Sequence, residues 1–417
     1  MKISKEKIDF SKNFIWNALG TGLNSFNSLF FLIIVTRING EELAGMFSIG
    51  LAIGLILYTI GLYSGRVCHV TNIDSNTTDK DYLLNRSLTC ILMMILSMCI
   101  VTIRGYSGIK LDIVILLCLF KCFEAFSDIL YGIMQKNDCL YKAGQSLTLK
   151  SIIGLVAFFV VDYITHDLVF SLIILDIVNI LILLLFDIKI VEKIKEGKFT
   201  SESSSKEGIF GIFKNEFFVF ANSFAGIYVL NASKYAIDIY ATETIQAIFG
   251  YIMMPATVMI LFAQFILLPF LNKFKELYKN NQIKEFDLLG IKIKGIVFLF
   301  GIFAVTIAYF IGPEFLSFIY GVDLLDYRLY LMIIIASYIL YAISYINLVI
   351  LTTMRKTFIQ FIVYLVSMFV AFLSSSFFVK NYGIFGATVS IAVTLTVQFV
   401  LYIMITKIVI FKAKRKA

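Results

Sequence analysis

The stretch FKCFEAFSDILYGIMQKND, residues 120–138, places charged side chains inside an apolar run long enough to cross a bilayer. Lys121, Glu124 and Asp128 recur at steps of three and four residues, and Tyr131 and Gln135 continue the same register. All five side chains therefore share one face of a helix. Ionisable groups at membrane depth are costly unless they face protein or water, so the stripe predicts that this helix borders a polar cavity. A Lys121–Glu124 ion pair that only holds helices together is the alternative interpretation.

The composition of the whole chain predicts a polytopic helical membrane protein. Of its 417 residues, 59% are hydrophobic and only 15% are charged, and the mean hydropathy is +0.89. A soluble chain would carry about 25% charged residues. The six cysteines and two histidines show no metal or disulfide spacing, and the phosphate-binding loop of an ATP-driven pump is missing. We expect neither a cofactor nor a metal, and no catalytic constellation indicates an enzyme.

Continuous apolar runs of about 20 residues predict an all-α fold with about twelve transmembrane helices. The predicted spans are 13–35, 43–66, 84–103, 112–135, 147–164, 168–187, 215–238, 246–270, 291–311, 329–352, 358–378 and 386–409. A polar, Ser-rich segment separates six spans from six. We therefore predict an N-terminal six-helix lobe (1–195), a cytoplasmic linker (196–214) and a C-terminal six-helix lobe (215–417) around a central cavity, which is the plan of a transporter.

The basic residues predict the orientation of these spans. Of the 36 Lys and Arg residues, 29 fall in the tails and alternate loops on one side, and five fall in the opposite loops. This asymmetry places both termini in the cytoplasm. The net charge of +8 then reflects topology, so we expect anionic membrane lipids as partners and no nucleic acid. Lys121 and Lys234 are the two basic residues left within the predicted spans.

Polar residues within three other spans are candidates for the wall of the cavity. The first span carries Asn13, Asn17, Gly20, Asn24 and Asn27 on one face, and packing between helices explains such a stripe equally well. The seventh span carries Asn231, Lys234, Tyr235 and Asp238, and the tenth carries Tyr338, Tyr341 and Tyr345.

These residues suggest two kinds of chemistry. A cation such as Lys234 would meet a phosphate-bearing substrate, although a Lys234–Asp238 ion pair is the simpler explanation. Tyrosine rings suit sugar faces, although a packed core also uses them. Asp176, a lone acid in the sixth span, would carry a proton or pair with Lys121. With Glu124 and Asp128 it forms the set of candidates for proton or ion coupling.

Three motifs resemble those of bacterial polysaccharide flippases, which belong to the multidrug/oligosaccharidyl-lipid/polysaccharide (MOP) exporter superfamily. The run EAFSDILYGIMQKND (124–138) resembles their fourth-span signature, and YGIFGA (382–387) resembles the start of their last span. The run NASKYAI (231–237) is similar to their seventh-span motif, which usually reads Asn-x-Pro-Arg-Tyr. Here the proline is missing and Lys234 stands for the arginine, which keeps the charge and loses the bidentate fork.

The resemblance implies a flippase of the bacterial cytoplasmic membrane for an undecaprenyl-pyrophosphate-linked oligosaccharide repeat unit. It would work by alternating access in O-antigen (lipopolysaccharide), capsule or exopolysaccharide assembly, with a membrane polymerase and glycosyltransferases as partners. A cation-coupled multidrug exporter of the same superfamily is one alternative, and its cavity should be dominated by acids. A membrane polysaccharide polymerase is a second alternative, which the short outer loops disfavour.

Overall fold

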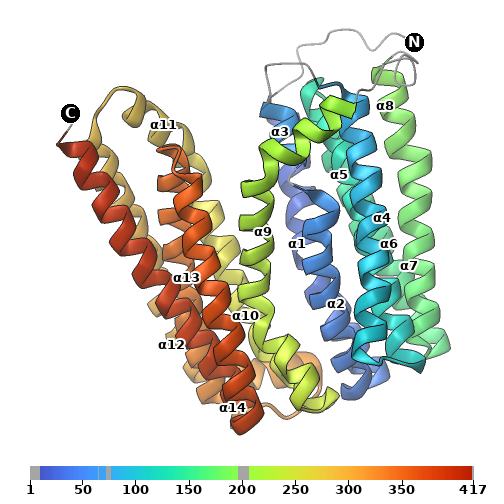
Figure 1. Cartoon of the computed structure of the whole chain (residues 1–417). Helices are drawn as coiled ribbons and strands as arrows, with labels where there is room; N and C mark the ends of the chain where they lie inside the picture. The colour runs from blue at the N-terminus through green and yellow to red at the C-terminus, as the bar shows by residue number, and fades with distance from the viewer. Residues whose placement is uncertain (1–9, 64, 72–76, 196–205, 416–417) are drawn as a thin grey trace. The chain divides into compact units, whose positions relative to one another are not determined.

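The computed structural model describes residues 10–63, 65–71, 77–195 and 206–415, and each regular element in these ranges is a helix (Figure 1). Residues 1–224 and 225–417 form two compact units, called unit 1 and unit 2 below. Of the predicted linker 196–214, residues 196–205 lie outside the described residues, and 206–214 begin a long helix. The predicted lobe boundaries stay a prediction.

The described helices of unit 1 are α1 (Phe10–Asn39), α2 (Glu41–Leu62), α3 (Gly65–Thr71), α4 (Asp79–Arg104), α5 (Gly108–Lys136), α6 (Leu140–Thr165), α7 (Leu168–Ile182), the π-helical turn η1 (Leu183–Ile188), α8 (Lys189–Ile194) and the start of α9 (Lys206–Tyr240). Unit 2 contains the rest of α9, α10 (Glu243–Leu267), the 3-10 turn η3 (Leu268–Phe270), α11 (Leu271–Lys279), α12 (Ile283–Tyr320), the 3-10 turn η4 (Leu325–Tyr327), α13 (Arg328–Thr353) and α14 (Thr357–Lys414).

The helices confirm the predicted all-α membrane fold. Within the described ranges, nine helical stretches are long and apolar enough to cross a membrane. The helices α5 and α9 are also long, at 29 and 35 residues, but carry more charge. The 58-residue α14 is divided at Gly383, where φ is 55° and ψ is −130°, a conformation that glycine tolerates. Counting α14 as two and adding α5 and α9 gives the twelve predicted spans.

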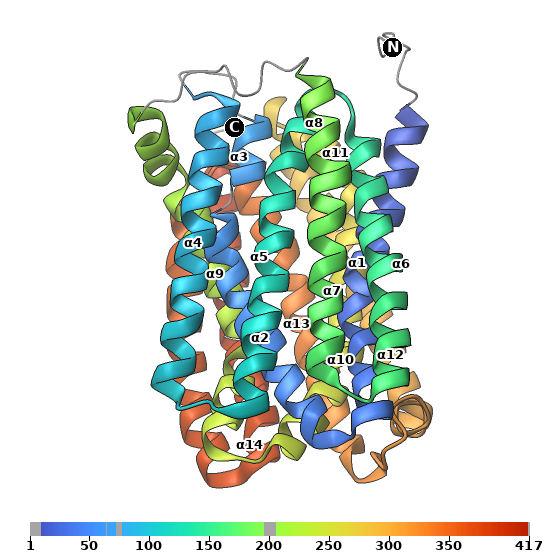
Figure 2. The same cartoon turned by 90° about the vertical axis from the view of Figure 1, so that its right-hand side faces the viewer.

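The packing of unit 1 brings polar faces of its helices together. In Figure 2, α4, α5 and α7 run side by side, and α5 packs against α2, α4 and α7. Gly20 on α1 meets Gly144 on α6 so closely that a Cβ at Gly20 would lie 2.4 Å from the Gly144 carbonyl oxygen. A ring cluster at one end of this contact includes Phe31 and Phe158, with centroids 5.0 Å apart. These contacts hold α1 closely against α6.

Unit 2 is built around α13, which packs against α10, α12 and α14. Gly301 on α12 lies against Ile339 on α13, and a Cβ added to Gly301 would lie 2.5 Å from the Ile339 side chain. The rings of Tyr251 on α10 and Tyr320 on α12 stack with centroids 4.3 Å apart. The bend at Gly383 folds the two halves of α14 back on each other, which brings residues near both ends of this helix together.

Candidate functional site

Unit 1 contains a polar cavity of about 170 Å³. Five helices and the short α3 contribute to its wall, and side chains from α1 and α5 dominate it. The lining residues are Thr21, Asn24, Ser25, Asn27, Phe31, Tyr58, Arg66, Phe120, Glu124, Ser127, Asp128, Tyr131, Leu147, Lys150, Leu175 and Asn179. The wall thus combines two acids, two cations, three amides and several hydroxyls. The charged stripe predicted on residues 120–138 does face a polar interior.

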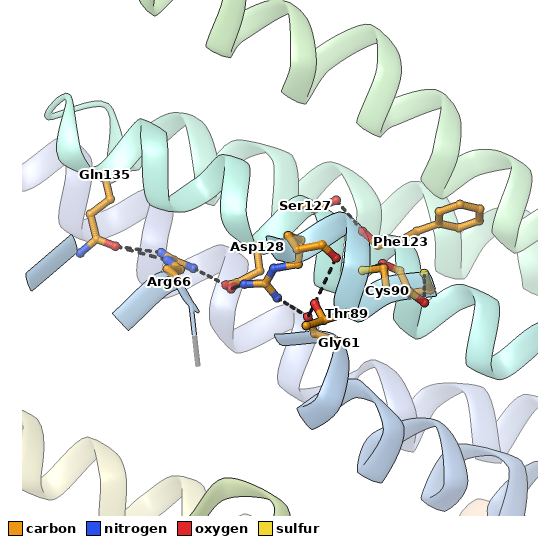
Figure 3. Close-up of polar contacts among 10 residues, drawn as sticks. Gly61, Arg66, Thr89, Cys90, Phe123, Ser127, Asp128 and Gln135 are labelled. Carbon is orange, nitrogen blue, oxygen red and sulfur yellow. Dashed lines mark hydrogen bonds and ion pairs between the residues drawn. The ribbon is translucent and has the colours of Figure 1, made fainter. Parts of the chain in front are cut away.

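Asp128 on α5 is held between two arginines. Arg66 Nη1 lies 3.2 Å from Oδ1 of Asp128, and Arg86 Nη2 lies 3.3 Å from Oδ2. Arg66 also donates to Oε1 of Gln135 from Nε and Nη2, at 3.3 and 3.1 Å. Figure 3 shows Arg66 lying between Gln135 and Asp128, which are two helical turns apart on α5. One carboxylate therefore links α3, α4 and α5.

Arg86 is the buried member of this network. Its side chain is 1% exposed, and its second guanidinium bond goes from Nη1 to the carbonyl oxygen of Gly61, at 3.1 Å. The Thr89 hydroxyl donates to the same carbonyl at 2.7 Å (Figure 3). Gly61 lies at the C-terminal end of α2, where backbone carbonyls have no partner within the helix. Arg86 thus ties the end of α2 to Asp128.

The position of Arg66 depends on α3, which is anchored by its buried histidine. Nε2 of His69 lies 2.7 Å from Oδ1 of Asp79 on α4, and Lys136 Nζ lies 3.2 Å from the same oxygen. On the same helix, burial and the nearby Glu216 carboxyl raise the pKa of the Cys68 thiol to about 12. The thiol therefore stays protonated at neutral pH, and α3 is held by ion pairs and packing.

Glu124, one turn before Asp128, forms the ion pair predicted from the sequence. Lys121 Nζ lies 2.6 Å from Oε2 of Glu124, and both side chains are mostly buried, at 14% and 13% exposure. The ammonium group also lies 4.9 Å from the ring centroid of Phe120 and 5.8 Å from that of Tyr58. Because Glu124 lines the cavity as well, the pair and the polar interior occur together, and the two interpretations of the stripe do not exclude each other.

A second buried ion pair closes the other side of the cavity. Lys150 on α6 lies 2.6 Å from Oδ2 of Asp187, and the two side chains are 7% and 0% exposed. The same ammonium donates to the hydroxyls of Ser127 and Tyr131 on α5. Asp187 lies in the π-helical turn η1, a local widening of the helix that often marks functional sites. Lys150 therefore joins α5, α6 and η1.

The polar stripe of α1 divides into a packing half and a lining half. Asn13 accepts a hydrogen bond from the Tyr141 backbone at 2.8 Å, and Asn17 lies at the close contact with Gly144. Farther along the helix, Asn24 and Asn27 line the cavity. The sequence left lining and packing equally weighted, and each explanation holds for one part of the stripe.

The remaining candidates of unit 1 have different surroundings. Gln135 and Lys121 do not line the cavity, but each contacts a residue that does. Asp176 on α7 is 5% exposed, and neither of its carboxylate oxygens has a hydrogen-bond partner among the described residues. The suggested Asp176–Lys121 pair is not formed, because Lys121 pairs with Glu124.

The candidates of unit 2 have surroundings within their own unit. Asn231 is buried and donates to the carbonyl of Ile227 in its own helix. Lys234 is half-buried and makes no ion pair with a described residue, so the suggested Lys234–Asp238 pair is not formed. Tyr235 and Asp238 are half-buried on the same helix, α9. Tyr341 is buried with its ring centroid 6.2 Å from that of Tyr338, which is core packing, and Tyr345 is half-buried.

The prediction that Lys121 and Lys234 are the basic residues within the spans is wrong for unit 1. Arg86 and Lys150 are buried inside α4 and α6, where they neutralise Asp128 and Asp187. The charge count assigned both to the ends of spans, because it weighs position in the sequence and not burial. The signal that could have found them is the excess of acids over cations in the predicted membrane interior.

Known proteins resemble this chain in sequence and in fold. No protein-family model matches the chain. The chain is 24% identical over 410 residues to the capsular polysaccharide biosynthesis protein CapF of Staphylococcus aureus, covering 94% of this chain and 98% of CapF. A multidrug resistance MATE family transporter of the MOP superfamily, in an inward-facing conformation, superposes with a TM-score of 0.73 at 12% identity, over 97% of this chain and 99% of the transporter.

The chain shares its fold with solved proteins of the MOP superfamily and with a lipid flippase. The lipid II flippase MurJ, in an inward closed conformation, also superposes with a TM-score of 0.73, at 15% identity over 94% of this chain and 87% of MurJ. Because the identities to both solved structures are low, these likenesses show the fold. They confirm the predicted fold class, and the long apolar helices are those of a multi-pass membrane protein.

Proposed function

We propose that this chain is a flippase that moves an undecaprenyl-pyrophosphate-linked oligosaccharide repeat unit across the bacterial cytoplasmic membrane by alternating access. The observation that carries the proposal is the similarity to CapF, a capsular polysaccharide biosynthesis protein, over nearly the whole length of both chains. The MurJ likeness adds that the fold accommodates a lipid-linked substrate in another protein. Both termini would face the cytoplasm, and a polymerase and glycosyltransferases would be the partners.

The charge of the unit 1 cavity agrees with a substrate that carries phosphate and sugar. Counting the lining residues and their ion partners, the cluster holds four basic and three acidic side chains. The amides of Asn24, Asn27 and Asn179 offer donors and acceptors of the kind that sugar hydroxyls bind. A multidrug exporter that carries cations would favour an excess of acids, which this cavity does not have.

The size of the cavity limits its role. At about 170 Å³ it is smaller than the roughly 300–1,000 Å³ of typical small-molecule sites, so it does not enclose an oligosaccharide. We therefore assign the unit 1 cavity to coupling and to contact with one part of the substrate. We also propose that Lys234 meets the phosphate of the substrate and that Tyr341 and Tyr345 face its sugars, which rests on the chemistry of these side chains.

The ion pairs distinguish the three candidates for proton or ion coupling, which are Glu124, Asp128 and Asp176. Protonating Asp128 would leave two arginines without a counter-ion, whereas protonating Asp176 breaks no ion pair. We propose Asp176 as the proton carrier and Glu124 as the second candidate. Asp176→Asn should uncouple export from the proton gradient, and normal export driven by the gradient in this variant would remove Asp176 from the mechanism.

Deletion followed by complementation tests the proposed function. Cells that lack the chain should accumulate lipid-linked repeat units that glycan-modifying reagents added outside cannot reach, and the wild-type chain should restore access. A matched complementation with Asp176→Asn, which breaks no ion pair among the described residues, separates loss of transport from loss of expression when membrane levels are measured. If deletion leaves the glycan outside and instead raises drug sensitivity, the multidrug exporter, which the MATE likeness favours, replaces the flippase.

A further inference from the structure

A second cavity, in unit 2, opens between the two ends of α14. It has a volume of about 640 Å³ and is lined by Tyr278, Met354, Lys356, Ile359, Ile405, Ile408, Val409, Lys412, Ala413 and Arg415. The helix α11, the turn between α13 and α14, and the C-terminal end of α14 all lie at one end of unit 2 (Figure 1). The bend at Gly383 creates this groove, because it brings residue 359 back beside residue 405.

The groove has an apolar floor and a basic rim. Ile359, Ile405 and Val409 form the floor, and no acidic side chain is among the lining residues. On the rim, Lys356 and Lys412 are exposed and make no hydrogen bond or ion pair to any described side chain. By contrast, the neighbouring Lys414 is neutralised by Asp287 at 2.7 Å and does not line the groove.

The rim cations are therefore available to an external anion. The Arg415 guanidinium lies 4.9 Å from the Phe411 ring centroid, and no described carboxylate forms an ion pair with it. The rim therefore carries three cations, Lys356, Lys412 and Arg415, above an apolar floor. An anionic amphiphile would fit this groove with its charged group at the rim and its hydrocarbon tail on the floor. Basic pockets between helix ends are where acidic headgroups bind on the cytoplasmic side of membranes.

We propose that this groove is a binding site for an acidic phospholipid of the surrounding membrane. The lining favours a phospholipid over the lipid-linked oligosaccharide, because the Tyr278 hydroxyl is the one uncharged polar side-chain group on the wall. A sugar chain would find almost no hydrogen-bond partners there, whereas a phosphate and an acyl chain are both accommodated. The bound lipid bridges α11 and both halves of α14, and so stabilises the end of unit 2 where the two ends of α14 meet.

Titration of the purified full-length chain with lipid, followed by native mass spectrometry, tests the site. In an uncharged detergent, one phosphatidylglycerol should bind more tightly than phosphatidylcholine. Each lysine beside a lipid phosphate contributes about fivefold to binding, so Lys356→Ala with Lys412→Ala should weaken phosphatidylglycerol binding about 30-fold. The matched control is Lys284→Ala with Lys292→Ala, which removes two exposed lysines of unit 2 that do not line the groove.

A charge-neutral variant separates the groove from surface charge. Ile408 is 51% exposed on the wall, so Ile408→Trp fills the groove without disturbing the core and should also weaken phosphatidylglycerol binding at least several-fold. Equal losses in both lysine pairs, or no preference for phosphatidylglycerol in the wild-type chain, would overturn the proposal. Displacement of phosphatidylglycerol by a low concentration of a polyprenyl diphosphate would overturn it too, because the occupant would then be the transport substrate.

Discussion

Asp128→Asn is the substitution whose effect the structure predicts most directly. The change keeps the shape of the side chain but removes the charge that neutralises Arg66 and Arg86. Arg86 is 1% exposed, and its other side-chain hydrogen bond to a described residue goes to the Gly61 carbonyl, so its charge loses the carboxylate that neutralises it. Removing one partner of a buried ion pair costs roughly 3–5 kcal/mol. Because Asp128 is 18% exposed, we expect the lower end, about 3 kcal/mol.

A loss of folding stability of this size can be measured, and further variants can test its cause. For a unit of this size, about 3 kcal/mol corresponds to a fall in Tm of about 6–12 °C. The assay is thermal unfolding of the purified chain in detergent, with membrane levels and glycan export measured in cells. Glu124→Gln is the matched control, because it neutralises an acid one turn away that has one lysine partner on its own helix. We expect a smaller loss of stability for Glu124→Gln and reduced export for both variants.

A double variant distinguishes the buried charge from a packing defect. Arg86→Met combined with Asp128→Asn removes the buried cation as well, so part of the lost stability should return. If Asp128→Asn melts at the wild-type temperature, or if Arg86→Met adds its full cost to it, the two residues are not coupled. Wild-type stability together with normal export would refute the account of this network.

Three further predictions concern the rest of the chain. Lys234→Ala should abolish glycan export while the protein still reaches the membrane, and Lys234→Ala with Asp238→Ala should stay inactive; recovery of export in the double variant would show that Lys234 only neutralises Asp238. Gly383→Ala should lower the unfolding free energy by about 1–3 kcal/mol, because φ is +55° there, and an unchanged melting temperature would contradict a strained bend. In a cysteine-free background, Asp323→Cys should react with an impermeant thiol reagent on intact cells and Lys279→Cys should not, whereas labelling at 279 would contradict the predicted orientation.

The sequence predicted one side of the charge network and missed the other. Glu124 and Asp128 stand out because α5 is a single helix whose face follows from residue spacing alone. The partners of Asp128, Arg66 and Arg86, come from other helices, and where those helices pack against α5 is a property of the tertiary structure. The count of basic residues places both arginines on the cytoplasmic side, because a basic residue near the end of a span fits the positive-inside rule whether or not it is buried.

The first helix illustrates the same limit within one element. The spacing of its polar residues shows that they share a face, but not what that face meets along its length. The close contact of Gly20 with Gly144 turns one half of the stripe into a packing surface, and the other half, with Asn24 and Asn27, is left to the cavity. Which half serves which purpose depends on a glycine 124 positions away in the sequence, and periodicity carries no information about that pairing.

The arrangement of the ion pairs constrains how unit 1 can move during transport. Buried ion pairs are rarely worth more to stability than well-packed apolar residues, so their energetic contribution alone does not explain them. Asp128 links α5 to α3 and α4, while Lys150 links α5 to α6 and to Asp187 in η1. A shift of α5 by one turn would therefore have to exchange partners on both sides at once. Because the ion-pair partners can be exchanged only in one step, unit 1 would have two conformations without stable intermediates. Alternating access requires two such conformations.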